Sequence, residues 1–234
     1  MQNKTTIITV LIAFALGVAF GLLLQTPKTS VKDEKSADKT EYIFSGEGQQ
    51  TLGPISLKEG LTIIQAKNST GPNDIFSIDV TQDKNGDGKL DPGEGWTGVG
   101  ISVGYKAAET YNGKIPFKAY DADYYISVDG GKWEITVTQP EKLKKSAKGI
   151  KQFNGTGDDV TEKFFLKEGV NKFRATYNGD GNFIVTLFDE NGNSTSRLVN
   201  EIGDTDLIFE YKNPFAGNYV FAIKAKGSWS IEAK

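Results

Sequence analysis

An internal repeat is the feature that most constrains how this 234-residue chain can fold. The sequence FSGEG at residues 44–48 recurs as FNGTG at residues 153–157, and LKEG at residues 57–60 recurs unchanged at residues 166–169. Both matches have the same spacing, so no net insertion separates them. A repeat of this kind predicts two copies of one structural unit.

The end of each copy carries a third match at a shorter spacing. GKWEI at residues 131–135 corresponds to GSWSI at residues 227–231. The first copy is therefore longer by a net 13 residues, close to the length of an acidic, glycine-rich segment at residues 83–94. That segment has no counterpart in the second copy, so we interpret it as an insertion into a domain that folds without it.

The apolar residues of each copy alternate as they do in β-strands. Two such runs in the second copy are Phe183, Val185 and Leu187, and then Tyr219, Phe221 and Ile223. Turn-forming pairs such as Asn191-Gly192 and Asn213-Pro214 separate the runs. About seven short strands in each copy predict an antiparallel β-sandwich.

The apolar run at residues 7–24 holds no charged side chain and, as a helix, would span about 27 Å, close to the hydrocarbon thickness of a bilayer. A cleaved secretory signal has a shorter apolar core and a small-x-small cleavage site. The sequence LQTP at residues 24–27 offers no such site. The run therefore favours an uncleaved signal-anchor.

The orientation of this anchor has two readings. Lys4 precedes the run and four lysines follow it within residues 28–39, so the positive-inside rule alone would keep the body in the cytoplasm. A lone N-terminal signal-anchor ahead of a folded domain nevertheless usually exports that domain. We expect the body on the extracytoplasmic face, at the cell surface.

The predicted fold class is all-β, with two tandem antiparallel β-sandwich domains preceded by a single N-terminal transmembrane helix. The predicted boundaries are 1–25 for the anchor, 26–41 for a flexible polar stalk, 42–138 for domain 1 with the loop 83–94, 139–151 for a linker, and 152–234 for domain 2.

The chain contains no Cys and no His. This removes thiolate nucleophiles, imidazole bases and nearly all zinc sites, so a bound metal must be held by oxygen, as calcium and magnesium are. No motif for carboxylate, Ser-Lys or Tyr catalysis is present, and we expect no enzyme activity. The net charge is −3 without a basic stripe, which excludes nucleic acid as an expected partner.

The segment 83–94 (DKNGDGKLDPGE) matches every fixed position of the EF-hand calcium loop. Its Asp and Asn oxygens can converge on one ion, and Gly88 supplies the sharp turn that a side chain would obstruct. Leu90 is the expected apolar anchor to the core. The predicted Ca²⁺ ligands are Asp83, Asn85, Asp87, the backbone carbonyl of Lys89, Asp91 and Glu94.

The residues around this loop do not form the two helices of an EF-hand. IFSIDVTQ at residues 75–82 alternates as a strand, and GWTGVG at residues 95–100 cannot hold a stable helix. The loop therefore resembles the dockerin-like, helix-poor calcium loops of secreted proteins. We expect it to act as a structural clamp with an affinity on the order of 10⁻⁴–10⁻³ M.

The glycine-flanked strands and the Gly-x-Trp-x-Ile endings resemble prokaryotic extracytoplasmic surface domains of the pre-peptidase C-terminal type. The resemblance covers about residues 42–138 and 152–234. It implies a domain that binds, spaces or attaches.

Several further side chains have two readings. Trp133 and Trp229 could stack on sugars, but their matching places in both copies favour core positions. Trp96 is interpreted as a plug beneath the ion site or as a binding residue. The acidic pairs Asp121/Asp123 and Asp158/Asp159 are expected to be solvated rather than to hold a second ion. The sequons at Asn68, Asn154 and Asn193 fall in segments that resemble turns.

These features favour a non-enzymatic surface protein that binds calcium and serves adhesion, envelope structure or scaffolding. One alternative is a carbohydrate-binding or substrate-capturing module, which would show aromatic side chains lined up on one exposed sheet face. Another is a filament subunit that exchanges strands between copies, which would show an unpaired strand around residues 42–44. The expected partners are calcium, the membrane and a surface polysaccharide or protein.

Overall fold

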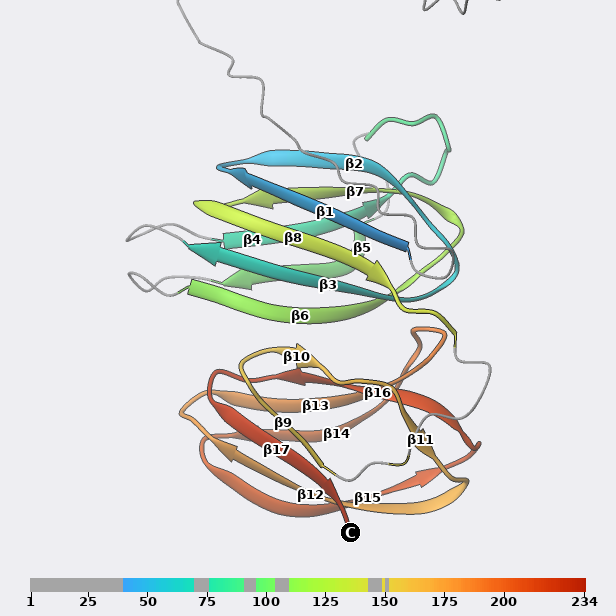
Figure 1. Ribbon diagram of the computed structural model, residues 1–234, viewed down its shortest axis with the longest axis vertical. Helices are drawn as coiled ribbons and strands as arrows, with labels where there is room; N and C mark the ends of the chain where they lie inside the picture. Colours follow the sequence, from blue (N-terminus) through green and yellow to red (C-terminus); the bar gives the residue numbers. More distant parts are fainter. Residues whose placement is uncertain (1–39, 70–75, 91–95, 104–109, 143–148, 150–151) are drawn as a thin grey trace, which may run out of the picture.

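The computed structural model describes residues 40–69, 76–90, 96–103, 110–142, 149 and 152–234. In this part of the chain the fold is all β, with no helix, and the named strands pair antiparallel (Figure 1), which confirms the all-β, antiparallel part of the predicted fold class. The predicted membrane segment at residues 7–24 lies outside the described residues. Among those described, no helix is long and apolar enough to cross a membrane.

The first half of the described chain forms two four-stranded sheets, with the orders β1-β8-β3-β6 and β2-β7-β4-β5. Its strands are β1 (Thr40–Glu47), β2 (Gln50–Leu57), β3 (Gly60–Ser69), β4 (Phe76–Gln82), β5 (Trp96–Val103), β6 (Thr110–Ala119), β7 (Ala122–Asp129) and β8 (Lys132–Gln139).

The second half forms sheets with the orders β15-β12-β17-β9 and β10-β16-β13-β14, and β11 also pairs with β16. Its strands are β9 (Gln152–Thr156), β10 (Asp159–Val160), β11 (Phe164–Leu166), β12 (Gly169–Asn178), β13 (Asn182–Asp189), β14 (Ser194–Ile202), β15 (Thr205–Asn213), β16 (Gly217–Lys224) and β17 (Ser228–Ala233).

The two halves share one topology. In the first half β3 pairs with both β6 and β8, as β12 pairs with both β15 and β17 in the second. The strands β10 and β11 together take the place of β2. The two copies of the sequence repeat therefore fold with the same strand order.

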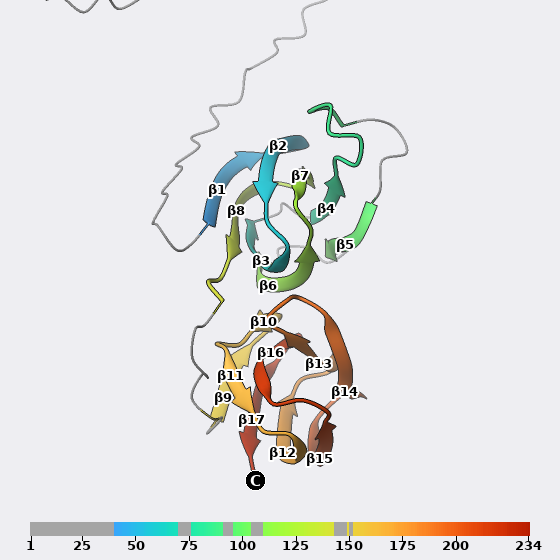
Figure 2. The ribbon, with the colours of Figure 1, turned by 90° about the vertical axis from the view of Figure 1, so that its right-hand side faces the viewer.

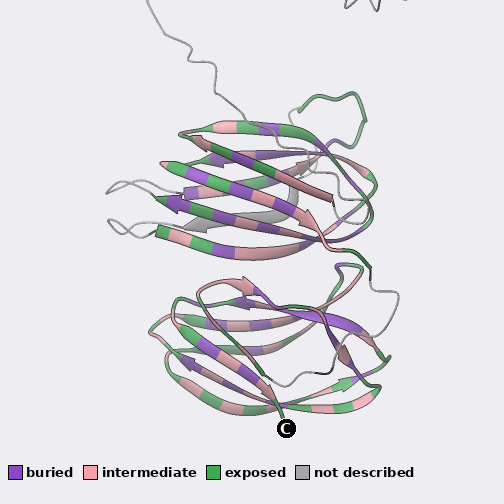
Figure 3. Cartoon of the chain, in the orientation of Figure 1, coloured by how far each residue is buried: buried purple, intermediate pink, exposed green. Residues whose placement is uncertain are grey.

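Each half is a sandwich whose core lies between its two sheets (Figures 2 and 3). In the first half, Ile64 and Ile135 of one sheet and Ile78 and Ile126 of the other belong to one fully buried cluster. Alternation along each strand places every second side chain in this layer. Burying an aliphatic side chain of this size stabilises the fold by about 1.5–3 kcal/mol.

The two sandwiches contact each other through a separate apolar cluster. Leu61 of β3 packs with Val160 and Val220 of the second sandwich, and all three are buried. Ile63 and Phe188 pack against them while partly buried.

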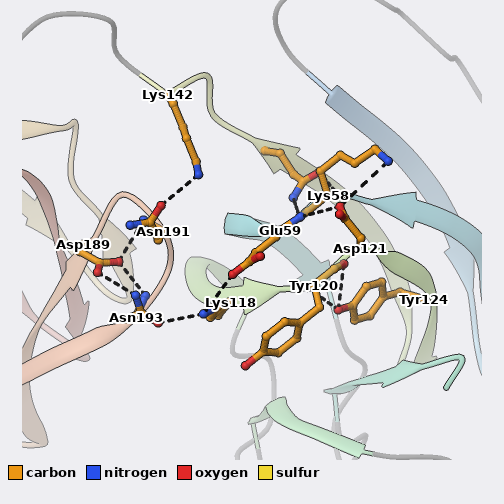
Figure 4. A network of polar contacts seen from close by, with 11 residues as sticks. Lys58, Glu59, Lys118, Tyr120, Asp121, Tyr124, Lys142, Asp189, Asn191 and Asn193 are labelled. Atoms are coloured by element: carbon orange, nitrogen blue, oxygen red, sulfur yellow. Dashed lines mark hydrogen bonds and ion pairs between the residues drawn. The ribbon is translucent and has the colours of Figure 1, made fainter.

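Polar contacts flank this cluster on both sides. On one side the hydroxyl of Tyr111 donates to Asp158 at 3.2 Å, and the Lys114 ammonium lies 2.9 Å from the Asp159 carboxylate. On the other, Lys118 donates to Asn193 at 3.1 Å (Figure 4). The interface therefore combines apolar burial with specific polar pairs.

Candidate calcium-binding loop

The predicted loop lies in the connection between β4 and β5, which runs over residues 83–95. Figures 1 and 2 show its described part, residues 83–90, at the end of the first sandwich that is remote from the second. The strands β13 and β14, which correspond to β4 and β5, are joined by the shorter turn at residues 190–193. The extra length of the first copy therefore includes this connection.

Asp83 anchors the start of the loop. Its backbone N–H donates to the carbonyl of Asp123 in β7 at 2.9 Å, which continues the pairing of β4 with β7. Its carboxylate is buried and accepts two backbone N–H groups, from Gly86 at 2.7 Å and from Gly88 at 2.9 Å. The chain is thereby folded around the carboxylate at loop position 1.

The next two predicted ligands repeat this arrangement. Asn85 Oδ1 accepts the N–H of Asp87 at 2.9 Å, and Asp87 Oδ1 accepts the N–H of Lys89 at 2.9 Å. Gly86 and Gly88 have φ values of 71° and 75°, the left-handed region in which a side chain is strained. Each side-chain oxygen has two lone pairs, so these bonds leave acceptor capacity for an ion.

The second half of the predicted ligand set is not described. Asp91 and Glu94 lie outside the described residues, as do the side chains of β5, including Trp96. Within the described part of the chain, no three acidic side chains are grouped so that they could hold a metal ion. Of the predicted ligands, the described part of the loop therefore includes Asp83, Asn85, Asp87 and Lys89.

One expectation about the loop was wrong. Leu90 was expected to tie the loop to the core, but its side chain is 39% exposed. The absence of flanking helices agrees with the sequence, because strands β4 and β5 border the loop directly.

The loop also has a partial counterpart that sequence comparison missed. Residues 189–193 (DENGN) follow the same pattern as residues 83–87 (DKNGD), at the same connection of the sandwich. Gly192 has a φ of 83°, and Asp189 accepts the N–H groups of Asn191 and Asn193. The shared Asp-x-Asn-Gly sequence could have revealed this counterpart. It is only four residues long, however, and its spacing differs from that of the two gapless matches.

The other acidic pairs are occupied within the protein. Asp121 accepts the N–H of Glu59 at 3.0 Å, and Asp123 accepts the hydroxyl of Ser56 at 2.5 Å. Asp158 and Asp159 were expected to be solvated, which was wrong. They lie at the interface between the sandwiches, where their partners come from β6, a strand distant in sequence.

Both tryptophans of the repeat are core residues, as expected. Trp133 is 2% exposed and Trp229 is 4% exposed. Among the sequons, the interpretation of Asn68 as a turn residue was wrong, because it lies within β3 and is buried. Asn154 is exposed but lies in strand β9, and Asn193 lies in an exposed turn.

No family model matches the chain, and no curated protein matches it. Solved structures resemble it at low TM-scores. The N-terminal tandem CBM22 domains of Xyn10C from Paenibacillus barcinonensis share 9% identity, covering 90% of this chain and 91% of that one, with a TM-score of 0.27. The PBSX exported protein XepA shares 9% identity, covering 92% and 88%, with a TM-score of 0.27. HutD from Pseudomonas fluorescens SBW25 shares 10% identity, covering 93% of each, with a TM-score of 0.23. These values establish neither a common fold nor a common function.

Proposed function

We propose that this chain is a non-enzymatic calcium-binding surface protein, in which one ion at residues 83–94 stiffens the first of two sandwiches. The observation that carries the proposal is the buried Asp83 carboxylate, around which the backbone from Gly86 to Gly88 folds. A carboxylate in this setting, followed by oxygen donors at alternate positions, is the donor set that calcium prefers. The bound ion would complete its shell with Asp91 and Glu94.

The proposed role is mechanical rather than switching. An EF-hand sensor responds by changing the angle between two helices. Here β4 and β5 belong to one sheet and pair with each other, so the loop joins two strands whose relative position is already fixed. An ion that binds such a loop stabilises the folded state without moving the strands.

Calcium titration of the full chain, followed by thermal melting, tests this proposal. We expect millimolar calcium to raise the melting temperature, because a ligand that binds only the folded state stabilises it. Asp83→Ala is expected to abolish the shift. Asp180→Asn is the matched control, because Asp180 is an exposed acid in a turn of the second sandwich. If calorimetry detects no calcium binding to the unmodified chain, the proposal is wrong.

The location of the protein is a second part of the proposal. Residues 7–24 would anchor it to the membrane, with the sandwiches on the extracytoplasmic side. Protease added to intact cells should then degrade the sandwiches while a cytoplasmic marker survives. Protection of the sandwiches until the cells are lysed would place them inside.

The carbohydrate-binding alternative has less support. Among the large hydrophobic side chains exposed in the described residues, the aromatic ones are Tyr120 and Phe215. They lie in turns of different sandwiches and therefore do not form a row on one sheet face. The strand-exchange alternative required an unpaired strand around residues 42–44, but β1 pairs with β8 from Thr40 to Glu47.

A further inference from the structure

The end of the first sandwich that contacts the second is built around Leu61. This residue follows the LKEG turn and pairs with Lys118 across β3 and β6. The turn at residues 189–193 of the second sandwich, called here the docking turn, fits closely against it. A Cβ on Gly192 would lie 2.9 Å from the Lys118 Cα and 3.1 Å from the Leu61 Cα, so the backbones approach as closely as glycine allows.

The second sandwich repeats this end, and no other sandwich covers it in the part of the chain that the structure describes. Val170 follows the second LKEG turn and pairs with Lys212 across β12 and β15, so it corresponds to Leu61. Val170 is 65% exposed, whereas Leu61 is 3% exposed. Phe215 lies in the turn after β15 and is 74% exposed. We call Gly169, Val170, Lys212 and Phe215 the tail surface.

The first sandwich repeats the docking turn at its opposite end. Residues 83–87, called here the head loop, carry the same Asp-x-Asn-Gly pattern at the same connection. Gly86 has a φ of 71°, close to the 83° of Gly192, but no described residue lies within 4 Å of the position that its Cβ would occupy. The head loop is therefore a docking turn with open space around its glycine.

The two free ends also match in charge. At the interface within the chain, the Lys118 ammonium donates to the Asn193 side chain. The corresponding residues at the free ends are Lys212 on the tail surface and Asp87 in the head loop. A lysine opposite a carboxylate forms a stronger, charge-assisted bond than a lysine opposite an amide.

We propose that the head loop of one chain docks on the tail surface of a second copy of this chain. The interface between copies would reproduce the one between the two sandwiches of each copy. Because its two sides are different surfaces, each copy keeps one free head and one free tail, and the assembly extends head to tail instead of closing as a symmetric dimer. This inference does not depend on calcium binding at the loop.

Sedimentation velocity of the full chain in detergent micelles, over a range of protein concentrations, tests the proposal. We expect the sedimentation coefficient to rise with concentration, both in millimolar calcium and after chelation. Val170→Lys is expected to weaken association at least about tenfold, because it places an unpaired charge in the contact. Ile202→Lys is the control, since Ile202 is 78% exposed but lies outside the tail surface.

A second variant distinguishes head-to-tail docking from other arrangements. Gly86→Asn keeps a residue that tolerates positive φ but adds a side chain where the backbones must approach. Alone, each variant should remain a single chain. Mixed, they should form one-to-one complexes, because the Gly86→Asn tail and the Val170→Lys head are both intact. Thermal melting confirms that both variants fold.

Three results would overturn the proposal. One is an unmodified chain that stays single at every concentration. Another is equal loss of association in Ile202→Lys and Val170→Lys, which would indicate a nonspecific effect of charge. The third is association that Val170→Lys abolishes but Gly86→Asn leaves intact, which would indicate tail-to-tail pairing.

Discussion

The indole N–H of Trp133 donates a hydrogen bond to the carbonyl oxygen of Gly48 at 3.0 Å, and Trp229 makes the same bond to Gly157 at 3.0 Å. In each sandwich the tryptophan comes from the last strand and the glycine follows the first. The repeated FxGxG and GxWxI sequences are therefore the two sides of one contact, which joins the ends of each domain.

The first glycine of the FxGxG motif makes room for this contact. Gly46 lies opposite Trp133 in the pairing of β1 with β8, and Gly155 lies opposite Trp229 in the pairing of β9 with β17. A Cβ on either glycine would overlap the indole ring of its partner. We predict that Gly46→Ala lowers the free energy of unfolding by about 1–3 kcal/mol, the usual cost of overpacking.

Urea denaturation measures this effect. Gly155→Ala should produce a similar loss in the second sandwich. Gly149→Ala should leave stability nearly unchanged, because its Cβ position has no neighbour within 4 Å among the residues that the structure describes. Equal stability of Gly46→Ala and Gly149→Ala would show that the ring can move aside without cost.

The hydrogen bond itself can be removed with little change of shape. Trp133→Phe keeps an aromatic ring in the core but deprives the Gly48 carbonyl of its indole donor. Because this bond is only partly buried, its loss should cost about 1 kcal/mol, in addition to the packing lost with the smaller ring. Trp229→Phe should behave alike in urea denaturation, and a loss confined to one of the two variants would contradict an equivalent role.

The repeat made much of this fold predictable. Matches such as FSGEG and FNGTG correspond to the same local structure, in which a glycine of the first strand lies opposite a tryptophan of the last strand. This structure occurs in both sandwiches because the same strands pair in each. The alternation of apolar residues predicted the β class, and the matching places of Trp133 and Trp229 in the two copies predicted their burial. These inferences succeeded because they depend on short segments.

The contacts between the sandwiches were not predictable in the same way. Asp158 and Asp159 read as a solvated acidic pair because their partners, Tyr111 and Lys114, are more than 40 residues away along the chain. The exposure of Leu90 and the burial of Asn68 likewise depend on how the strands and loops are placed in three dimensions. Composition and local sequence patterns do not show which distant residues come into contact, so these features could not be predicted from them.

For the calcium loop, Gly88 provides a test that leaves every predicted ligand in place. Its φ of 75° would strain an alanine by about 1–2 kcal/mol. We predict that Gly88→Ala binds calcium about tenfold more weakly, since 1.4 kcal/mol corresponds to a factor of ten. Gly203 has a φ of 80° in a turn of the second sandwich, so Gly203→Ala should lose stability but keep the calcium affinity measured by calorimetry. Equal affinity in both variants would contradict the predicted loop geometry.

The interface between the sandwiches should make stability depend on pH. Burial raises the pKa of the Asp158 carboxyl, although the N–H of Ala225 and the hydroxyl of Tyr111 both donate to it. The folded protein therefore keeps a proton on Asp158 over a pH range in which the unfolded chain has lost it. Stability falls as pH rises through that range, which begins near the ordinary carboxyl value of 3.8.

Asp158→Asn should remove this dependence and retain the contacts. Its amide oxygen can still accept from Ala225, and its amide nitrogen can donate to the Tyr111 hydroxyl. We predict that the variant gains stability relative to the unmodified chain as the pH is raised from about 3 to about 7, because only the unmodified chain must bury an ionised carboxylate there. Urea denaturation across this range measures the difference. Asp180→Asn, at an exposed position, should follow the unmodified chain. Parallel pH profiles for Asp158→Asn and the unmodified chain would show that folding does not shift the pKa of Asp158, and would contradict the prediction.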